Sequence, residues 1–415
     1  MDVQMQHACG LDVHQATVVA CLLSVLDSGK VKKQIRTFGT TTRELQALRQ
    51  WLQLEGCQQV AMESTGVYWK PVYALLEGSL ELTVANAQQI KNVPGRKTDV
   101  KDAEWIADLL LHGLLKASFV PPKPIRELRD LTRYRRKLAE SQSAEGNRLL
   151  KVLETANIKL ASVASDVFGV SGMHMLDALA QGTATPAKMA ELTRGRLRGK
   201  IPQLEPALEG RLEEYHRYML KLQLRRLRDL DRDLAELDAH IQEKLKPYQP
   251  QVELLRGIPG VDAILAAVIV AELGVDMNVF ESAPRLAAWA GLCPGNHESA
   301  GKRRKVRVTK GNVHLKTALV EAAHASTRAK GTYLRDKYFR LKARRGAKRA
   351  VVAIAHKILV SIYHMLSGDV SYHDLGDLYL DKLNKHHLTR NLVRRLQRLG
   401  YYVTLQPQVV QQLAA

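Results

Sequence analysis

The sequence predicts an α/β domain at the amino terminus, a mixed sheet with helices packed on it. An α-helical arm and a mainly α-helical carboxy-terminal domain are predicted to follow. Segments rich in β-branched residues come first and then alternate with helical patterns, which is typical of a mixed sheet. A long leucine stripe and two apolar stretches with helical spacing come later and contain no strand pattern.

The amino-terminal domain is expected to span residues 1–120. CGLDVH, ATVVACLLSV and KVKKQIRTF predict a three-strand meander, because they are β-rich and are separated by turn residues. Thr41 and Glu44 have the spacing of a capping box and predict the start of a helix. QQVAMES is a fourth strand that ends at Glu63, and after a helix LELTVANA is a fifth. VPPKP, residues 120–124, marks the end of this domain.

The arm is expected to span residues 121–250. Apolar residues recur there at steps of three and four, which predicts a coiled coil or a long helical hairpin, with an ordinary long helix as the alternative. The stripe consists of Leu220, Leu224, Leu227, Leu230, Leu234, Leu237, Ile241 and Leu245. Arms of this kind often assemble subunits.

The carboxy-terminal domain is expected at residues 251–365, with a helical tail at 366–415. LLRGIPGVDAILAAVIVAELG has two apolar helical stretches around Gly257, Pro259 and Gly260, and it resembles a helix-hairpin-helix. In such motifs the amides of the turn can hold a phosphate. The tail shows no chemical motif.

Charge is the strongest indication of a partner. The chain of 415 residues has a net charge of +20, and with 46% apolar residues it is a globular protein of ordinary composition. Residues 301–349 hold 17 Lys and Arg against two acids, so 17 − 2 = +15 lies there. A protein with this much positive charge usually binds a polyanion, and nucleic acid is the simplest candidate. The sequence has no long apolar run and no signal-peptide pattern, so we expect a cytoplasmic protein without a membrane partner.

Four carboxylates occupy places that suit metal-assisted phosphodiester chemistry. Asp12 lies in the first strand, Glu63 ends the fourth, and Asp99 and Asp102 open a helix at i and i+3. At about 100° per residue, both aspartates share the helix face of Ile106, which should be buried. A cation should therefore accompany the two aspartates. It is either Mg²⁺, with two ions expected, or the side chain of an arginine or lysine. His14, next to Asp12, is either a ligand or an ordinary histidine of the core or rim.

Ser299 precedes a dense basic run. The expected phosphate-binding cations are Lys302, Arg303, Arg304, Lys305, Arg307 and Lys310. The serine is either a nucleophile aimed at the phosphate that these cations hold or an exposed loop hydroxyl.

Several motifs in order resemble one known family. LDVH, MESTGVYW and KTDVKDAEWIADLL, with the four acids, are similar to the DEDD tetrad of the transposases of insertion-sequence family one hundred and ten. LLRGIPGVDAILAAVIVAELG, FESAPRLAAWAGLCPG and SAGKRRKVRVTKGN resemble the carboxy-terminal transposase domain of that family. The resemblance covers residues 8–160 and 252–345.

The resemblance implies a fold, an activity and partners. It implies a RuvC-like fold of the ribonuclease H class for residues 1–120, with Mg²⁺ bound by Asp12, Glu63, Asp99 and Asp102. It also implies a recombinase that moves its own element between donor and target DNA under the guidance of a structured bridge RNA. The serine of the second domain is implied to form a covalent phosphoserine, in a composite site shared between subunits of a tetramer. We expect a homo-oligomer, either a dimer or a tetramer.

The sequence departs from the family at the serine. Many relatives have two adjacent serines there, whereas this chain has Glu298 and Ser299, so Ser299 is the only hydroxyl for the role. Two other functions stay open at this point. One is a junction nuclease that uses metal-activated water, and the other is a non-enzymatic architectural nucleic-acid binder.

Overall fold

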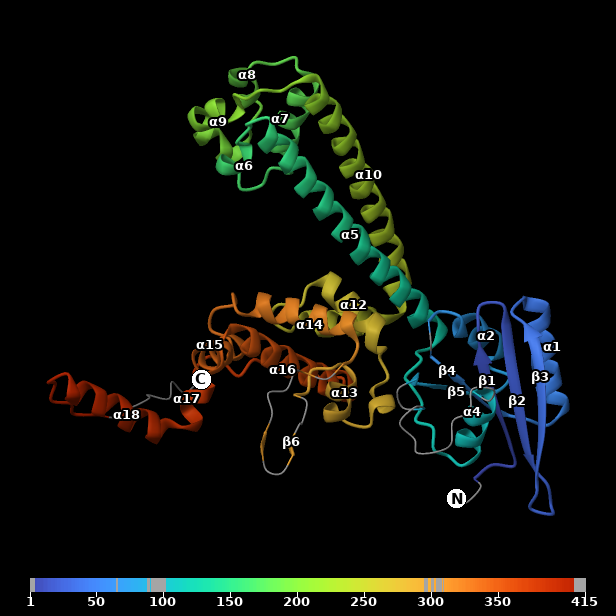
Figure 1. The fold of residues 1–415 in the computed structure, drawn as a ribbon. Coiled ribbons are helices and arrows are strands. Elements are labelled where there is room, and N and C mark those ends of the chain that lie inside the picture. The colour runs from blue at the N-terminus through green and yellow to red at the C-terminus, as the bar shows by residue number, and fades with distance from the viewer. Residues whose placement is uncertain are drawn as a thin grey trace. The chain divides into compact units, whose positions relative to one another are not determined.

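The computed structural model describes residues 4–64, 66–87, 90, 102–294, 298–299, 302–303, 308 and 310–406. The chain divides into two compact units, Met1–Val120 and Pro121–Ala415. They are called the amino-terminal and carboxy-terminal units below, and Figure 1 shows their elements.

The amino-terminal unit is built on a mixed five-stranded sheet with strand order β3-β2-β1-β4-β5. β1 (His7–Val13), β2 (Thr17–Val25) and β3 (Val31–Gly39) form the predicted antiparallel meander. β4 (Gln59–Glu63) pairs parallel to β1, and β5 (Glu81–Ala85) pairs parallel to β4. The sequence prediction of a mixed sheet is therefore confirmed, and this strand order is consistent with a RuvC-like fold.

Helices cover both faces of this sheet. The side chains of each strand point alternately to the two faces, so each face contributes to its own apolar core. Cys9 and Leu11 belong to the core under α1 (Thr42–Leu54) and α2 (Trp69–Leu76). Ala8 and Ala61 belong to the core under α4 (Asp102–Leu111). Even-numbered positions of β1 and odd-numbered positions of β4 therefore lie on the α4 face.

The start of α1 differs in detail from the capping box that the sequence predicts. The side chain of Thr41 accepts a hydrogen bond from the backbone N–H of Glu44 at 3.4 Å, as expected. The carboxylate of Glu44, however, accepts from the backbone N–H of Gly39 at 3.4 Å. Glu44 therefore ties the helix to the end of β3, two residues before the N-cap.

Two long helices dominate the first part of the carboxy-terminal unit. α5 (Lys123–Thr155) and α10 (Glu214–Leu245) pack against each other along a shared apolar seam, as Figure 1 shows. Of the predicted leucine stripe, Leu234 and Leu237 are half-buried and the other six residues are buried. The predicted long helical hairpin is confirmed. That its two helices form a coiled coil stays a prediction.

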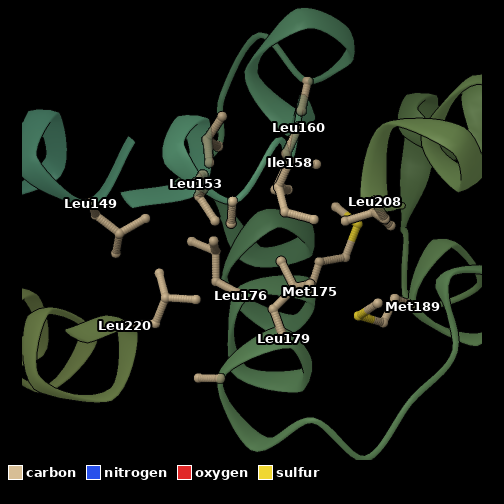
Figure 2. Packing of buried hydrophobic residues seen from close by; sticks show 14 of the residues in the cluster. Leu149, Leu153, Ile158, Leu160, Met175, Leu176, Leu179, Met189, Leu208 and Leu220 are labelled. Carbon is tan, nitrogen blue, oxygen red and sulfur yellow. The ribbon is translucent and has the colours of Figure 1, made fainter. Parts of the chain in front are cut away.

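A cluster of short helices closes the far end of this pair. α6 (Leu160–Val163), α7 (Val170–Gln181), α8 (Pro186–Ala190), the 3-10 helix η1 (Gly195–Lys200) and α9 (Ile201–Leu208) lie between α5 and α10 in the chain. Figure 2 shows how Leu153 of α5, Leu176 of α7 and Leu220 of α10 meet in one apolar core.

The remaining helices form a second bundle. The 3-10 helix η2 (Lys246–Tyr248) leads from α10 into it. The bundle comprises α11 (Gln249–Arg256), α12 (Ala263–Leu273), η3 (Met277–Phe280), α13 (Ala283–Trp289), α14 (Val313–Ser326), α15 (Tyr333–Arg345) and α16 (Ala347–Gly368). α17 (Tyr379–Leu383) and α18 (Lys385–Arg398) follow as the predicted helical tail.

α16 alone among the described helices is long and apolar enough to cross a membrane. Ile354, Ile358 and Ile362 on its inner side are fully buried, and α16 packs against α14 and α15. The buried side of α16 identifies it as a core helix. A core helix can be as apolar as a helix that spans a membrane.

Candidate active site

Asp12 and Glu63 lie on neighbouring parallel strands. β1 and β4 pair Gly10 with Ala61 and Leu11 with Met62, so the same register brings Asp12 beside Glu63. Neighbouring strands are about 4.8 Å apart. Alternation places both acids on the face that α4 covers, at the carboxyl ends of their strands.

Asp102 approaches the same face from the helix above it. A Cβ on Gly10 would lie 2.1 Å from the carbonyl oxygen of Ala103 and 2.4 Å from the nitrogen of Ala107. The first two turns of α4 therefore rest directly on β1, two residues before Asp12. Only glycine allows this approach, because any side chain would collide with helix backbone.

The prediction for the helical face of α4 is confirmed in its apolar part. Ile106, Leu109 and Leu110 are buried against the sheet. Asp102 is the first residue of the helix and is exposed, so it does not carry the desolvation cost expected from its face alone. Asp99 lies outside the described residues.

The described acids fit a magnesium site in their chemistry. Mg²⁺ prefers carboxylate oxygens, and Asp12, Glu63 and Asp102 bring three carboxylates to neighbouring elements on one sheet face. No group of three or more His, Cys, Asp and Glu is close enough to hold a metal within the described part of the chain. Of the four predicted ligands, the structure describes Asp12, Glu63 and Asp102. Each lies on the strand or helix for which the sequence predicted it.

His14 contacts Asp12 directly. Its Nε2 lies 3.1 Å from Asp12 Oδ2, and its side chain is 62% exposed, against 28% for Asp12. It is therefore a rim residue in this structure and not part of the core.

Ser299 lies in a two-stranded hairpin of the carboxy-terminal unit. β6 (Glu298–Ser299) and β7 (Lys302–Arg303) pair antiparallel, with Ser299 opposite Lys302 and Glu298 opposite Arg303. The backbone thus brings the serine opposite the first cation of the basic run. Lys310 is exposed, and Arg304, Lys305 and Arg307 lie outside the described residues.

Both legs of this hairpin are fixed at its base. Pro294 and Val308 form an antiparallel bridge. Gly311 packs on the other leg so closely that a Cβ there would lie 2.3 Å from the nitrogen of Gly291. The backbone N–H of Asn312 then donates to the carbonyl of Trp289 at 3.3 Å.

Glu272 anchors the end of the second leg. Its side chain is 0% exposed, and Oε2 accepts a 2.7 Å hydrogen bond from Asn312 Nδ2. Arg133 of α5 donates to both carboxylate oxygens, at 2.7 and 2.8 Å. Asn312 also caps α14, since its Oδ1 accepts from the N–H of Leu315. One buried carboxylate therefore joins α5, α12 and the segment that carries Ser299.

A second arginine completes this cluster. Arg129 donates to the backbone carbonyls of Ala271 and Glu272, at 3.1 and 2.7 Å. Burial by itself raises the pKa of Glu272, but the hydrogen bonds from Arg133 and Asn312 and the charges of Arg133 and Arg129 hold that pKa below its usual value. Burial also lowers the pKa of Arg129, but an arginine titrates so far above neutral pH that both partners stay charged.

Sequence reasoning missed the cluster of Glu272, Arg129, Arg133 and Asn312. A signal was available, because Glu272 is the one acid in AILAAVIVAEL and would be buried without a partner in any bundle. Its partners lie 139 residues before it and 40 residues after it, so spacing could not identify them.

The helix-hairpin-helix prediction is confirmed for the backbone, with α11 and α12 around a tight turn. Gly260 has φ +91°, and a Cβ there would lie 2.4 Å from the carbonyl of Ala322. The carboxylate of Asp262 caps α12 by accepting from Leu265 N–H at 2.8 Å. Because an acid already occupies this helix start and the turn presses on α14, the phosphate-binding expectation gains no support here.

The comparisons with known proteins agree with these features. Residues 9–158 match a family model described as a transposase, of the DEDD type and the IS110 group, and residues 252–339 match the model of the IS116/IS110/IS902 transposase family. The chain is a transposase of the IS110 family.

Relatives of this transposase carry matching names. A "Probable family 20 transposase" of Pseudomonas aeruginosa is 27% identical over 326 residues, which cover 75% of the chain and 85% of that protein. The "Transposase for insertion sequence element IS1111A" of Coxiella burnetii is 24% identical over 68% of the chain and 69% of its own length. The transposase is therefore similar to each of these proteins over more than two thirds of its length.

Proposed function

We propose that this transposase excises and inserts a mobile element by magnesium-assisted phosphoryl transfer through a covalent phosphoserine, guided by a bridge RNA. The observation that carries the proposal is the placement of Asp12 and Glu63 side by side under the helix that begins at Asp102. A chain of this family with acids in that arrangement has the donor set that phosphodiester chemistry needs.

The first unit would supply the metal site. Asp12, Glu63, Asp99 and Asp102 would hold Mg²⁺, as two ions, and the ions would polarise the phosphoryl oxygens and stabilise the departing sugar oxygen. The close contact at Gly10 holds Asp102 at a fixed height above the sheet. Such rigidity is what a site for charge stabilisation requires.

The second unit would supply the nucleophile. The hydroxyl of Ser299 gives up its proton as its Oγ attacks phosphorus and a Ser–O–P bond forms. The bond from phosphorus to one sugar oxygen breaks, and that oxygen takes up a proton, so the step is balanced. A hydroxyl of a different strand then attacks the phosphoserine, restores a phosphodiester and releases the serine. Lys302, Arg303, Arg304, Lys305, Arg307 and Lys310 would hold the backbone by phosphate contact.

The covalent intermediate separates this proposal from a junction nuclease. It conserves the energy of the broken phosphodiester, which serves rejoining and is superfluous in hydrolysis. We place the protein in the cytoplasm with donor DNA, target DNA and bridge RNA as partners. We propose a dimer or tetramer, with the acids and Ser299 meeting within or between subunits.

Ser299→Ala tests the nucleophile. Incubated with donor DNA, guide RNA and Mg²⁺, the variant should lose the protein–DNA adduct seen on a denaturing gel, together with strand exchange. Ser282→Ala is the matched control, because the side chain of Ser282 makes no capping bond at the start of α13. Cleavage by Ser299→Ala at the parental rate would exclude the phosphoserine and favour metal-activated water.

A further inference from the structure

The helical tail contains a groove that the proposed chemistry does not use. It has a volume of about 450 Å³ and runs along α18, where residue 405 of the tail returns to the helix. Its apolar part is Val393 and Leu405, and its polar part includes Lys385, Arg390 and Arg394. None of its lining residues is an acid.

Several cations on the other long helices have an acid as their partner. On α5 and α10, Arg135 is paired with Asp238, Arg228 with Asp177 and Lys244 with Glu127. Lys385, Arg390, Arg394, Arg395 and Arg398 of α18 are all exposed, and none forms an ion pair within the described residues. A solvated face of ordinary kind would mix both signs of charge.

The composition of the tail explains why these cations have no ion-pair partner among the described residues. Residues 382–415 include six Lys and Arg and no Asp or Glu. The nearest acid along the chain, Asp381, already binds Arg340 of α15 at 2.7 Å. The charge on α18 is therefore complementary to an anion from outside the chain.

We infer that the α18 groove binds an unpaired stretch of nucleic acid. Arg390 and Arg394 are one turn apart and offer two guanidinium forks to successive phosphates. The apolar side chains of Val393 and Leu405 in the lining of the groove can accept the face of a base only when that base is not paired. Tyr401 and Tyr402, 65% and 97% exposed directly after the helix, add rings on which further bases can stack.

This inference rests on the proposed function only in its assumption that the protein works on nucleic acid. The groove lies beyond residue 339, where the second family match ends. It is also separate in sequence from Ser299 and the four acids, so binding to it can be measured without strand cleavage.

Single-strand binding by the full chain is the test. Fluorescence anisotropy with labelled 12-nucleotide RNA, DNA of the same sequence and a hairpin duplex would compare Arg390→Gln/Arg394→Gln with the parent. We expect at least about tenfold weaker binding of the single strands and a salt slope smaller by about 1.4, at ~0.7 for each phosphate contact. Duplex binding should stay the same. The strand that the parent binds more tightly identifies the source, guide RNA or element DNA.

Two further variants make the result specific. Lys221→Gln/Arg225→Gln removes the same charge at the same spacing from the exposed side of α10 and should leave single-strand binding unchanged. Val393→Glu places a carboxylate in the lining of the groove and should weaken single-strand binding about as much as the double variant. Since α18 has no buried residue, thermal unfolding should not change in either α18 variant.

Three results would overturn the inference. Parental affinity and salt slope in the Arg390/Arg394 variant would show that the groove is not used. An equal loss for duplex and single strand would show a general charge effect. Loss of binding to phosphatidylglycerol vesicles, with oligonucleotide binding intact, would make α18 a membrane-surface helix. Repeating the titration in Ser299→Ala separates this inference from the proposed function, because the groove should bind equally well there.

Discussion

The two units handle their important carboxylates in opposite ways. Glu272 in the carboxy-terminal unit is fully buried and is held by Arg133 and Asn312. Asp12 in the amino-terminal unit keeps 28% of its side chain exposed and contacts His14, which is itself largely exposed. A carboxylate whose oxygens are all engaged inside the protein stabilises a fold. One that solvent reaches, at the end of a strand, can still exchange ligands.

Asp12→Asn should give the largest effect, and it should fall on activity alone. The substitution keeps the shape of the side chain and removes the charge that a metal needs, so strand cleavage should drop about 10³-fold. DNA binding and the melting temperature should stay near the parental values. Single-turnover cleavage assays beside filter binding measure both. Parental cleavage by this variant, and by Asp102→Asn, would favour the architectural binder.

Glu272→Ala should have the opposite profile, with a large effect on stability. It leaves Arg129, 14% exposed, and Arg133, 33% exposed, without their carboxylate. Because solvent still reaches Arg133, the expected cost is at the lower end for a broken buried pair, about 3 kcal/mol in the free energy of unfolding. Urea unfolding followed by circular dichroism measures this cost. Glu140→Ala on α5 is the control, because Glu140 pairs with Arg136 and Lys137 at the exposed surface and its loss should change stability little. Equal effects of the two variants would remove the contrast between the units.

Gly10→Ala should have the smallest effect of the three. It should lower both the stability of the protein and its strand cleavage. The new methyl group would push α4 away from β1, at a cost of about 1–3 kcal/mol. Asp102 would move with the helix, so cleavage should fall further than the loss of folded protein explains. Gly39→Ala is the matched control, since its Cβ would meet only the flexible side chain of Glu44, at 3.2 Å. Cleavage that follows the folded fraction alone would show that the position of Asp102 is not critical.

Sequence patterns were sufficient where the decisive contacts are local. β-branched runs predicted each of the five strands, and leucine spacing predicted the long helical pair, because side-chain periodicity follows from backbone geometry. The candidate acids were chosen by their positions in or at the ends of strands and at a helix start, and they stay a prediction. The motif match identified the family. The hairpin that carries Ser299, in contrast, was not predicted, because the sequence shows there only a serine before a basic run.

The tertiary structure decided what depends on distant partners. The approach of α4 to Gly10 and the burial of Glu272 between Arg133 and Asn312 depend on which segments meet. The composition of the tail excludes a local acid for the cations of α18, and the packing brings no distant acid among the described residues to them. Periodicity says which face of an element is apolar, but it does not say which other element covers that face. For this protein, the sequence therefore determined the elements, the charge and the candidate chemistry. The packing determined how rigidly Asp102 and the serine segment are held and which cations remain available to a partner.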